Sequence, residues 1–454
     1  MSEPRVCVYL LPARAPHTHL HISFNSHPLG AVRSMEEGQE ERMEEEEAME
    51  GGSEEEGEEG GGGKGEGLEC DFSAYKLFHE GSTGAPCLSF DILRDSLGED
   101  RTCDRPVTLY FVAGTQAARV HLNTVLLMKV SQLSRLKEGE SESESELEDE
   151  EDEGREPQIA SAAFKHNGGV NRIRATTINN VPIAAVWSEL GQVSVWELTP
   201  LLEEVDAGHV GSDQGRDEPP LFTFRGHRSE GFALDWSPVK PGTLATGDCQ
   251  RAIYIWRPQE GARWQVGGAP LAGHTASVED LQWSPSEASV LASCSVDRSI
   301  RVWDVRAPPN KACMITSDAH PTDINVLHWN HCEPFLASGG DDGCVRVWDL
   351  RNMQGGGGAV AELKHHTAPV TTVEWHSSEG SVLASGGEDD AILQWDLAVE
   401  REAPEEEEEE TPEQLLFVHR GQQEVKELHW HPQIPGLVVS TAHTGFNVFK
   451  TISC

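Results

Sequence analysis

Residues 273–304, GHTASVEDLQWSPSEASVLASCSVDRSIRVWD, contain the pattern that decides the fold. Apolar and polar residues alternate over short runs, such as Val278 to Trp283 and Ile300 to Asp304, and turn-forming pairs such as Ser284-Pro285 separate the runs. A period of two residues over a few positions is typical of a half-buried strand, whereas an amphipathic helix has a period of 3.6. The stretch therefore predicts short strands rather than helices.

The same pattern recurs along most of the chain. Three series of residues show the interval: Trp256, Trp303, Trp348 and Trp395; Trp236, Trp283, Trp329, Trp375 and Trp430; and His227, His274, His320, His366 and His419. Successive members are 45 to 47 residues apart, except in the last interval, which contains a run of glutamates. This period is close to the roughly 40–45 residues of a WD repeat, in which four strands form one propeller blade. The chain is therefore predicted to be an all-β, WD-repeat β-propeller.

Two further units bring the predicted number of blades to seven. A degenerate unit covers residues 160–196, and the β-rich runs 106–112 and 124–130 indicate another. An open propeller would expose sheet edges, so a strand is needed to close the ring. We expect the lone strand-like run 86–92 to close it by pairing beside residues 445–449.

The sequence also predicts how the chain is divided. Residues 1–68 are expected to form a disordered acidic segment, and residues 69–104 to contain a short helix over Asp71–Glu80, capped by Asp71, and the ring-closing strand. Residues 105–454 would form the propeller, with acidic loops at 138–157 and 399–414. No apolar run approaches the about 18 residues of a membrane span, so no membrane association is expected.

In the WD-repeat family that this pattern resembles, a His, a Ser or Thr, an Asp and a Trp form one hydrogen-bonded chain in each blade. Three units have the full set: His274, Ser293, Asp297 and Trp303; His320, Ser338, Asp342 and Trp348; and His366, Ser385, Asp389 and Trp395. In the unit of His227, Gln250 replaces the Asp, and the last unit has His443 and Phe449 at the Asp and Trp positions. We expect these two blades to be held less rigidly.

Charge limits the possible functions. The formal net charge is −42, and three runs at 36–59, 138–156 and 400–413 hold 35 of the 77 acidic residues with only three arginines. Such a field repels nucleic acid and attracts basic proteins. The ten cysteines form no CxxC pair, and no Cys/His spacing indicates a metal. No motif indicates a cofactor or a catalytic group, so the protein is expected not to be an enzyme.

Three motifs are similar to the nuclear histone-binding WD-repeat family, and particularly to its glutamate-rich members: TGAPCLSFDI at 83–92, GFALDWSP at 231–238 and ELHWHP at 427–432. The resemblance covers about residues 69 to 454. It implies a nuclear and nucleolar chaperone or scaffold that binds core histones and a large-subunit ribosomal protein. It also implies roles in chromatin dynamics, in replication-linked chromatin opening with replication-licensing partners, and in ribosome biogenesis.

The resemblance further implies a groove for a basic client. Its acidic wall would consist of Glu402, Glu405, Glu406, Glu407, Glu408, Glu409 and Glu410, and its facing wall of Phe72, Tyr75 and Leu77. A second surface, a propeller rim of Glu230, Asp323 and Glu424, would accept a basic tail. Ordinary solubilising charge explains the acidic runs and the rim residues equally simply.

Two other patterns remain open. The sequences WDVR and WDLR, which contain Asp304, Arg306, Asp349 and Arg351, are the short pattern used by substrate receptors of cullin-type ubiquitin ligases, and routine contacts within the blade are the alternative. Ser141, Ser143 and Ser145 each precede a glutamate by three residues, which suits acid-directed kinases and also ordinary low complexity.

Overall fold

The computed structural model describes residues 5–6, 71–136, 156–208, 215–311, 314–353, 357–399, 412–443 and 445–453. These residues belong to one compact unit, formed by Met1–Tyr9 and Glu69–Cys454. The second unit, Leu10–Leu68, lies outside the described residues, as do most of the acidic runs. The predictions of disorder for 1–68 and for the acidic loops therefore remain predictions.

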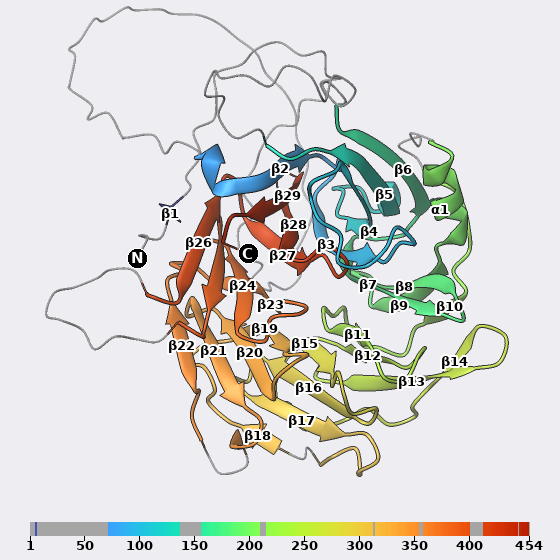
Figure 1. Cartoon of the computed structure of the whole chain (residues 1–454). Coiled ribbons are helices and arrows are strands. Elements are labelled where there is room, and N and C mark those ends of the chain that lie inside the picture. The colour runs from blue at the N-terminus through green and yellow to red at the C-terminus, as the bar shows by residue number, and fades with distance from the viewer. Residues whose placement is uncertain are drawn as a thin grey trace, which may run out of the picture. The chain divides into compact units, whose positions relative to one another are not determined.

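Seven antiparallel sheets follow one another around a ring, and each sheet is one blade of a propeller (Figure 1). The blades, from the innermost strand outward, are β3 (Cys87–Leu93), β4 (Val107–Thr115), β5 (Thr124–Leu133) and β6 (Gln158–Lys165); β7 (Val170–Ile178), β8 (Val181–Ser188), β9 (Gln192–Glu197) and β10 (Phe222–Phe224); β11 (Leu234–Trp236), β12 (Leu244–Gly247), β13 (Ile253–Gln259) and β14 (Arg263–Val266); β15 (Val278–Trp283), β16 (Val290–Ser295), β17 (Ile300–Asp304) and β18 (Met314–Thr316); β19 (Ile324–Trp329), β20 (Phe335–Gly340), β21 (Cys344–Asp349) and β22 (Ala361–Lys364); β23 (Val370–Trp375), β24 (Val382–Gly387), β25 (Ala391–Asp396) and β26 (Leu415–Arg420); and β27 (Val425–Trp430), β28 (Leu437–Ala442), β29 (Gly445–Thr451) and β2 (Tyr75–Gly81). The prediction of a seven-bladed, almost entirely β protein is confirmed.

The strand that closes the ring differs from the predicted one. β2 pairs antiparallel with β29 and completes the last blade, so the chain's two ends share one sheet. The predicted closing strand, β3, is instead the innermost strand of the first blade and pairs with β4. The ring therefore closes one strand earlier in the sequence than we predicted.

The helix predicted over Asp71–Glu80 is also wrong. Asp71 does act as a cap, because its carboxylate accepts the Ser73 backbone N–H at 3.0 Å, but the turn it starts is one turn of 3-10 helix, η1 (Phe72–Ala74). Extended backbone follows as β2, and a register shift lies between Tyr75 and Leu77. The irregularity spaces the buried side chains at intervals that imitate a helical period, which is why the sequence misled.

Regular helix in the described residues is limited to α1 (Thr199–Asp206) and two 3-10 turns, η1 and η2 (Val120–Leu122). Pro200 lies in the first turn of α1, where its missing N–H costs no hydrogen bond. Leu201 and Val205 face inward and pack in the same apolar cluster as Phe164 of β6. α1 thus covers the outside of the first blade (Figure 1).

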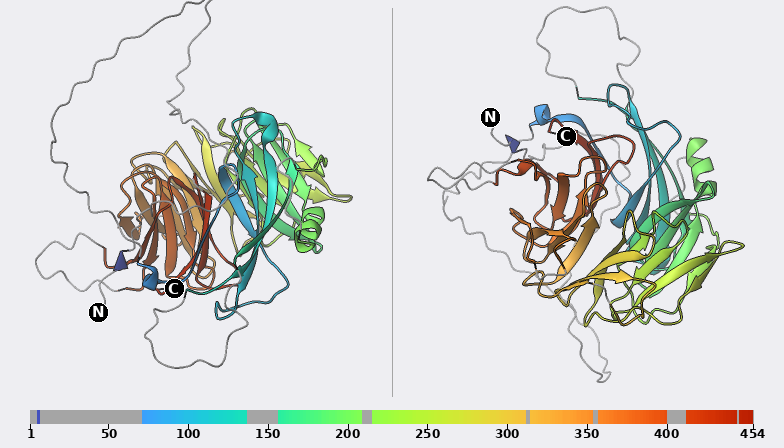
Figure 2. Two further views of the ribbon diagram at one scale, coloured as in Figure 1. Left: turned by 90° about the horizontal axis from the view of Figure 1, so that it is seen from above. Right: turned by 60° about the horizontal axis from the view of Figure 1, so that its bottom comes forward.

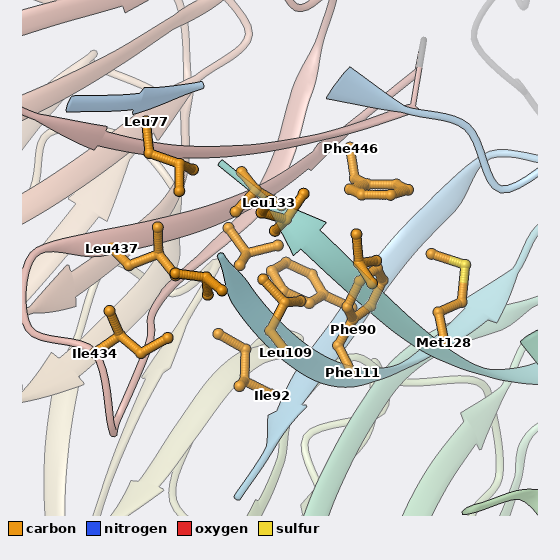
Figure 3. Packing of buried hydrophobic residues seen from close by; sticks show 14 of the residues in the cluster. Leu77, Phe90, Ile92, Leu109, Phe111, Met128, Leu133, Ile434, Leu437 and Phe446 are labelled. Atoms are coloured by element: carbon orange, nitrogen blue, oxygen red, sulfur yellow. The ribbon is translucent and has the colours of Figure 1, made fainter. Parts of the chain in front are cut away.

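The apolar core lies between neighbouring blades. Where the last blade meets the first, Leu77, Leu437 and Phe446 pack in one cluster with Phe90 and Phe111 (Figure 3). The Phe111 and Phe446 rings lie edge to face with centroids 5.1 Å apart. Burying each such side chain contributes about 1.5–3 kcal/mol, so this cluster joins the two ends of the chain strongly.

The predicted hydrogen-bonded chains are present in all three complete units. In the first of them, His274 lies 3.0 Å from the Asp297 carboxylate and 2.7 Å from the Ser293 hydroxyl, which also accepts the Trp303 indole N–H at 2.9 Å. The same contacts occur around His320 and His366. Each buried polar group thereby has a partner.

The unit of His227 is complete as well, contrary to the prediction. Its acid is Asp248, two residues before Gln250, and the Asp248 carboxylate lies 2.8 Å from Nδ1 of His227. Nε2 lies 2.8 Å from the Thr246 hydroxyl, and Trp256 donates to the same hydroxyl. Asp248 also accepts the Gln250 backbone N–H, so one carboxylate holds both the turn and the histidine.

In the last blade, His419 has different partners. Its Nδ1 lies 2.8 Å from the Tyr75 hydroxyl, and its ring stacks on Phe449 with centroids 4.1 Å apart. Nε2 lies 3.3 Å from the Asn447 amide. Burial lowers the pKa of His419 to about 3, so the ring is neutral at physiological pH. A residue from the N-terminal part of the chain, Tyr75, therefore supplies the contact that His443 was expected to make.

Candidate functional site

One apolar cluster joins three parts of the chain that are far apart in sequence. Ala74, Tyr75 and Phe78 come from the N-terminal part, and they pack with Phe417 of β26 and Phe449 of β29. Leu136 and Leu416 pack against the same cluster from its edge. The Tyr75 ring lies edge to face with Phe417, with centroids 5.3 Å apart.

The second acidic run leaves the fold at this cluster. Residues 134–136 lie along β2: the Leu136 N–H donates to the Lys76 carbonyl at 3.1 Å, and His79 Nε2 lies 3.0 Å from the Ser134 carbonyl oxygen. The acidic run begins at Glu138, two residues after Leu136. Its first residue is therefore held close to Tyr75 and Phe78.

The third acidic run returns to the fold at the same place. It ends at Glu413, and the chain then enters β26 at Leu415, whose N–H donates to the Pro412 carbonyl at 3.0 Å. Leu416 and Phe417 follow directly and pack in the cluster.

The first acidic run lies between two segments that are both attached here. Residues 5–6 form a short strand, β1 (Arg5–Val6), which pairs in parallel with Phe417 and Val418 of β26. The described chain resumes at Asp71, which caps the turn leading into Tyr75. All three acidic runs are thus attached around one cluster, which we call the acidic junction and define by Ala74, Tyr75, Phe78, Leu136, Leu416 and Phe417.

The acidic junction exposes two apolar side chains. Phe72 is 51% exposed, and its ring lies 6.1 Å from Phe78, edge to face. Ile452 is 42% exposed and is fixed beside the turn by its N–H, which donates to the Ala74 carbonyl at 3.0 Å. Sequence reasoning missed Ile452, because nothing in the sequence places the end of the chain beside residue 74.

The predicted facing wall of the client groove needs correction. Phe72 is exposed as that prediction requires, but Tyr75 and Leu77 are buried, at 4% and 0% exposure. Both lie in a strand of the last blade instead of on a helix, so their side chains point into the core. The predicted acidic wall, Glu402 and Glu405–Glu410, lies outside the described residues.

The three predicted rim residues lie just before the innermost strands of three blades. Glu230 is exposed and accepts the Asn171 side-chain N–H at 3.0 Å, and Glu424 is exposed beside Lys426 at 3.1 Å. Asp323 is half-buried, and burial together with Asp341 raises its pKa. Their role in holding a basic tail stays a prediction.

The two candidate docking arginines are exposed and fixed within their own turns. The side chains of Arg306 and Arg351 are 71% and 65% exposed. Arg306 Nε donates to Asp304 at 2.8 Å, and Arg351 Nε donates to Asp349 at 2.8 Å. Each aspartate also accepts the backbone N–H of its arginine, so these pairs do serve the blade turns. The candidate phosphorylation sites Ser141, Ser143 and Ser145 lie outside the described residues.

A polar cavity of about 210 Å³ lies on the ring axis, lined by the innermost strands. Its central group is Glu427, which is 1% exposed and accepts hydrogen bonds from Arg172 and Arg174 at 2.7 Å each. The Phe90 N–H and the Ser89 hydroxyl donate to its other oxygen. One carboxylate thus connects the last blade to the first two.

His429 lies beside this group. Its Nδ1 is 2.6 Å from the Glu374 carboxylate, and its Nε2 is 3.1 Å from the Phe90 carbonyl oxygen. Burial opposes the charged form, but Glu374 and Glu427 together raise the pKa of His429 to about 10. Within the described residues no group of three or more His, Cys, Asp or Glu side chains is arranged to hold a metal ion, and no helix has the length and apolarity of a membrane span.

The fold and the acidic junction define a WD-repeat β-propeller that presents acidic segments from one side of its ring. Comparisons with known proteins agree. Residues 268–304, 311–349 and 357–396 match the family "WD domain, G-beta repeat". Residues 65–134, which contribute Phe72, Tyr75 and the segment up to Ser134, match a family described by the histone-binding protein RBBP4 and the equivalent component of the CAF1 complex.

Full-length relatives identify the family more closely. The chain is 44% identical over 416 residues to "Protein HEAT STRESS TOLERANT DWD 1" of Arabidopsis thaliana, with 85% of this chain and 88% of that protein covered. It is 39% identical to "Ribosome assembly protein rrb1" of Schizosaccharomyces pombe, with coverage of 86% and 82%. It is also 39% identical to "Glutamate-rich WD repeat-containing protein 1" of Dictyostelium discoideum, with coverage of 85% and 82%. The chain belongs to the family of glutamate-rich WD repeat-containing proteins.

Proposed function

We propose that this protein is a chaperone and scaffold for basic proteins, namely core histones and a large-subunit ribosomal protein, and that it acts in chromatin dynamics and ribosome biogenesis in the nucleus and nucleolus. The observation that carries the proposal is the attachment of all three acidic runs around one apolar cluster. The names of the matched histone-binding family and of the ribosome assembly relative support the choice of clients.

The arrangement suits a basic amphipathic segment. Phe72 and Ile452 offer an apolar contact, and the runs that leave and enter beside them supply negative charge. Exposed ion pairs alone contribute little, about 0–1 kcal/mol each, so an apolar anchor is needed for a stable complex. Aromatic side chains that fill a contact often contribute more than the surrounding charges, whose main effect is on association rate and specificity.

We expect Phe72→Ser to weaken binding of purified core histones or of the ribosomal protein by roughly tenfold, the loss that about 1.4 kcal/mol of anchor contact would produce. Phe72 is half exposed, so the fold should remain intact. The measurement is titration calorimetry or fluorescence anisotropy at low salt. Leu97→Ser is the matched control, because Leu97 is 56% exposed and lies away from the acidic junction in the loop after β3. Equal affinities for both variants and the wild type would remove the acidic junction as the client site.

A second candidate function, a substrate receptor of a cullin-type ubiquitin ligase, is favoured by the exposure of Arg306 and Arg351 at corresponding turns of neighbouring blades. The third such turn has Ala398 instead. The double variant Arg306→Ala, Arg351→Ala is expected to lose a ligase adaptor from a pull-down while histone binding persists. An adaptor signal equal to that of the wild type argues against this role.

A further inference from the structure

The outer edge of β26 is unusual among the outermost strands of the blades. Its residues 415–418 read Leu-Leu-Phe-Val, and four of its six residues are buried. Other outermost strands carry charged residues, such as Arg263 in β14 and Glu362 and Lys364 in β22, and are mostly half-buried or exposed. An apolar edge strand with unpaired N–H and C=O groups invites another strand to add to it, and charged edges discourage such pairing. The edge of β26 therefore requires a cover.

The structure shows what covers it. β1 lies beside β26 in Figure 1 and Figure 2, and the pairing is parallel, with Arg5 opposite Phe417 and Val6 opposite Val418. The fold uses a similar device on the first blade, where Arg216 forms a parallel bridge to Phe164 at the edge of β6. β1 is held by backbone pairing, the kind of contact that an added strand makes.

We infer that the outer edge of β26 is a strand-addition site and that its occupant is the N-terminal segment of this same chain at Arg5–Val6. Phe417, which pairs with β1, also packs against Tyr75, four residues after Asp71. The segment between Val6 and Asp71 is thereby fastened at both ends to the acidic junction, and this segment contains the acidic run 36–59. The strand pairing is independent of the proposed function, whereas its consequence, a third acidic run held at the client site, rests on it.

Fastening both ends has a physical consequence. A segment attached at one end samples a large volume, and a second attachment raises its effective concentration at the site without any new contact to the client. We therefore expect the strand addition to increase client affinity through the acidic run it retains.

The test uses the full chain and its Val6→Pro variant. Proline has no backbone N–H and is excluded from paired strand positions, so this variant should release β1. Hydrogen exchange at residues 415–420 is expected to be about tenfold faster in Val6→Pro, because the backbone hydrogen bonds of the pairing are lost. Exchange in β22 should be unchanged. The matched control Ala13→Pro, outside the pairing, should leave both strands as in the wild type.

A labelled peptide of residues 1–12 provides the second arm. It should bind Val6→Pro, whose edge is empty, and should not bind the wild type, whose own segment competes at high effective concentration. Equal binding to both proteins, or unchanged exchange at residues 415–420, would overturn the inference. So would dimers of the wild type in light scattering that the peptide dissociates, because the occupant would then come from a second copy.

Client binding is measured separately on the same variants. Val6→Pro is expected to bind core histones several-fold more weakly than Ala13→Pro at low salt. If the exchange and peptide results hold but histone affinity is equal, the tethering role is wrong and the strand-addition site stands. The proposed function is judged independently by Phe72→Ser, which leaves β1 in place.

Discussion

Replacing Glu427 with glutamine is expected to destabilise the propeller by about 3–5 kcal/mol, the loss typical of breaking a buried ion pair by removing one partner. Glutamine keeps the shape of the side chain but not its charge. Arg172 and Arg174 would then remain on the ring axis without their carboxylate. A buried charge without a partner costs more than the pair contributed, so the loss should exceed that of any single hydrogen bond.

The measurement is urea unfolding followed by tryptophan fluorescence. Glu424→Gln is the matched control: Glu424 lies three residues earlier, its side chain is 60% exposed, and its ion pair with Lys426 is open to solvent. We expect that variant to lie within about 0.5 kcal/mol of the wild type. Similar midpoints for both variants would mean that Glu427 does not hold the first and last blades together.

The same buried group predicts a dependence of stability on pH. The pKa of His429 is raised to about 10 in the folded protein, above its usual value near 6.5. A raised folded pKa stabilises the fold fully below the unfolded value, and this contribution is lost as the pH rises toward the folded value. Stability should therefore fall between pH 7 and pH 9, and the slope should be smaller in His429→Gln.

The repeats made the fold predictable, because each blade buries the same residue types at the same spacing. Trp303, Ser293 and His274 recur at fixed distances along the chain, and each must find its hydrogen-bond partner inside its own blade. Local interactions of this kind are readable from one sequence. The resemblance to the histone-binding family was confirmed for the same reason, since its motifs occupy these strands.

Contacts between distant segments were not predictable in the same way. Tyr75 and His419 are separated by 344 positions, and no local pattern pairs them. Without that pairing, a three-residue spacing of aromatic residues indicated a helix where the chain adds a strand to the last blade. The role of Asp248 was missed because the turn is two residues shorter than the repeat pattern implied. The acidic runs were visible in the sequence, but their common place of attachment requires the closed ring.

Converting Glu405, Glu406, Glu407, Glu408, Glu409 and Glu410 to glutamine in one variant is expected to weaken binding of a basic client by roughly tenfold to a hundredfold at low salt. Each exposed pair contributes about 0.2–1 kcal/mol, and six of them acting together give a loss of this size. The run ends next to β26, which packs against Tyr75 in the acidic junction, so its charge is concentrated where the client is expected. The fold should not change, because these side chains belong to an insertion between β25 and β26.

The decisive control changes the same amount of charge elsewhere. Its substitutions are Glu203→Gln, Glu260→Gln, Glu287→Gln, Glu333→Gln, Glu379→Gln and Asp100→Asn, all at exposed positions of the described residues. If charge acts by its place, this variant should bind nearly as well as the wild type. Raising the salt to about 1 M shortens the screening length to about 3 Å, so the difference between the variants should disappear there. Equal losses in both variants would show that the client responds to total charge, and the acidic junction would then lose its special role.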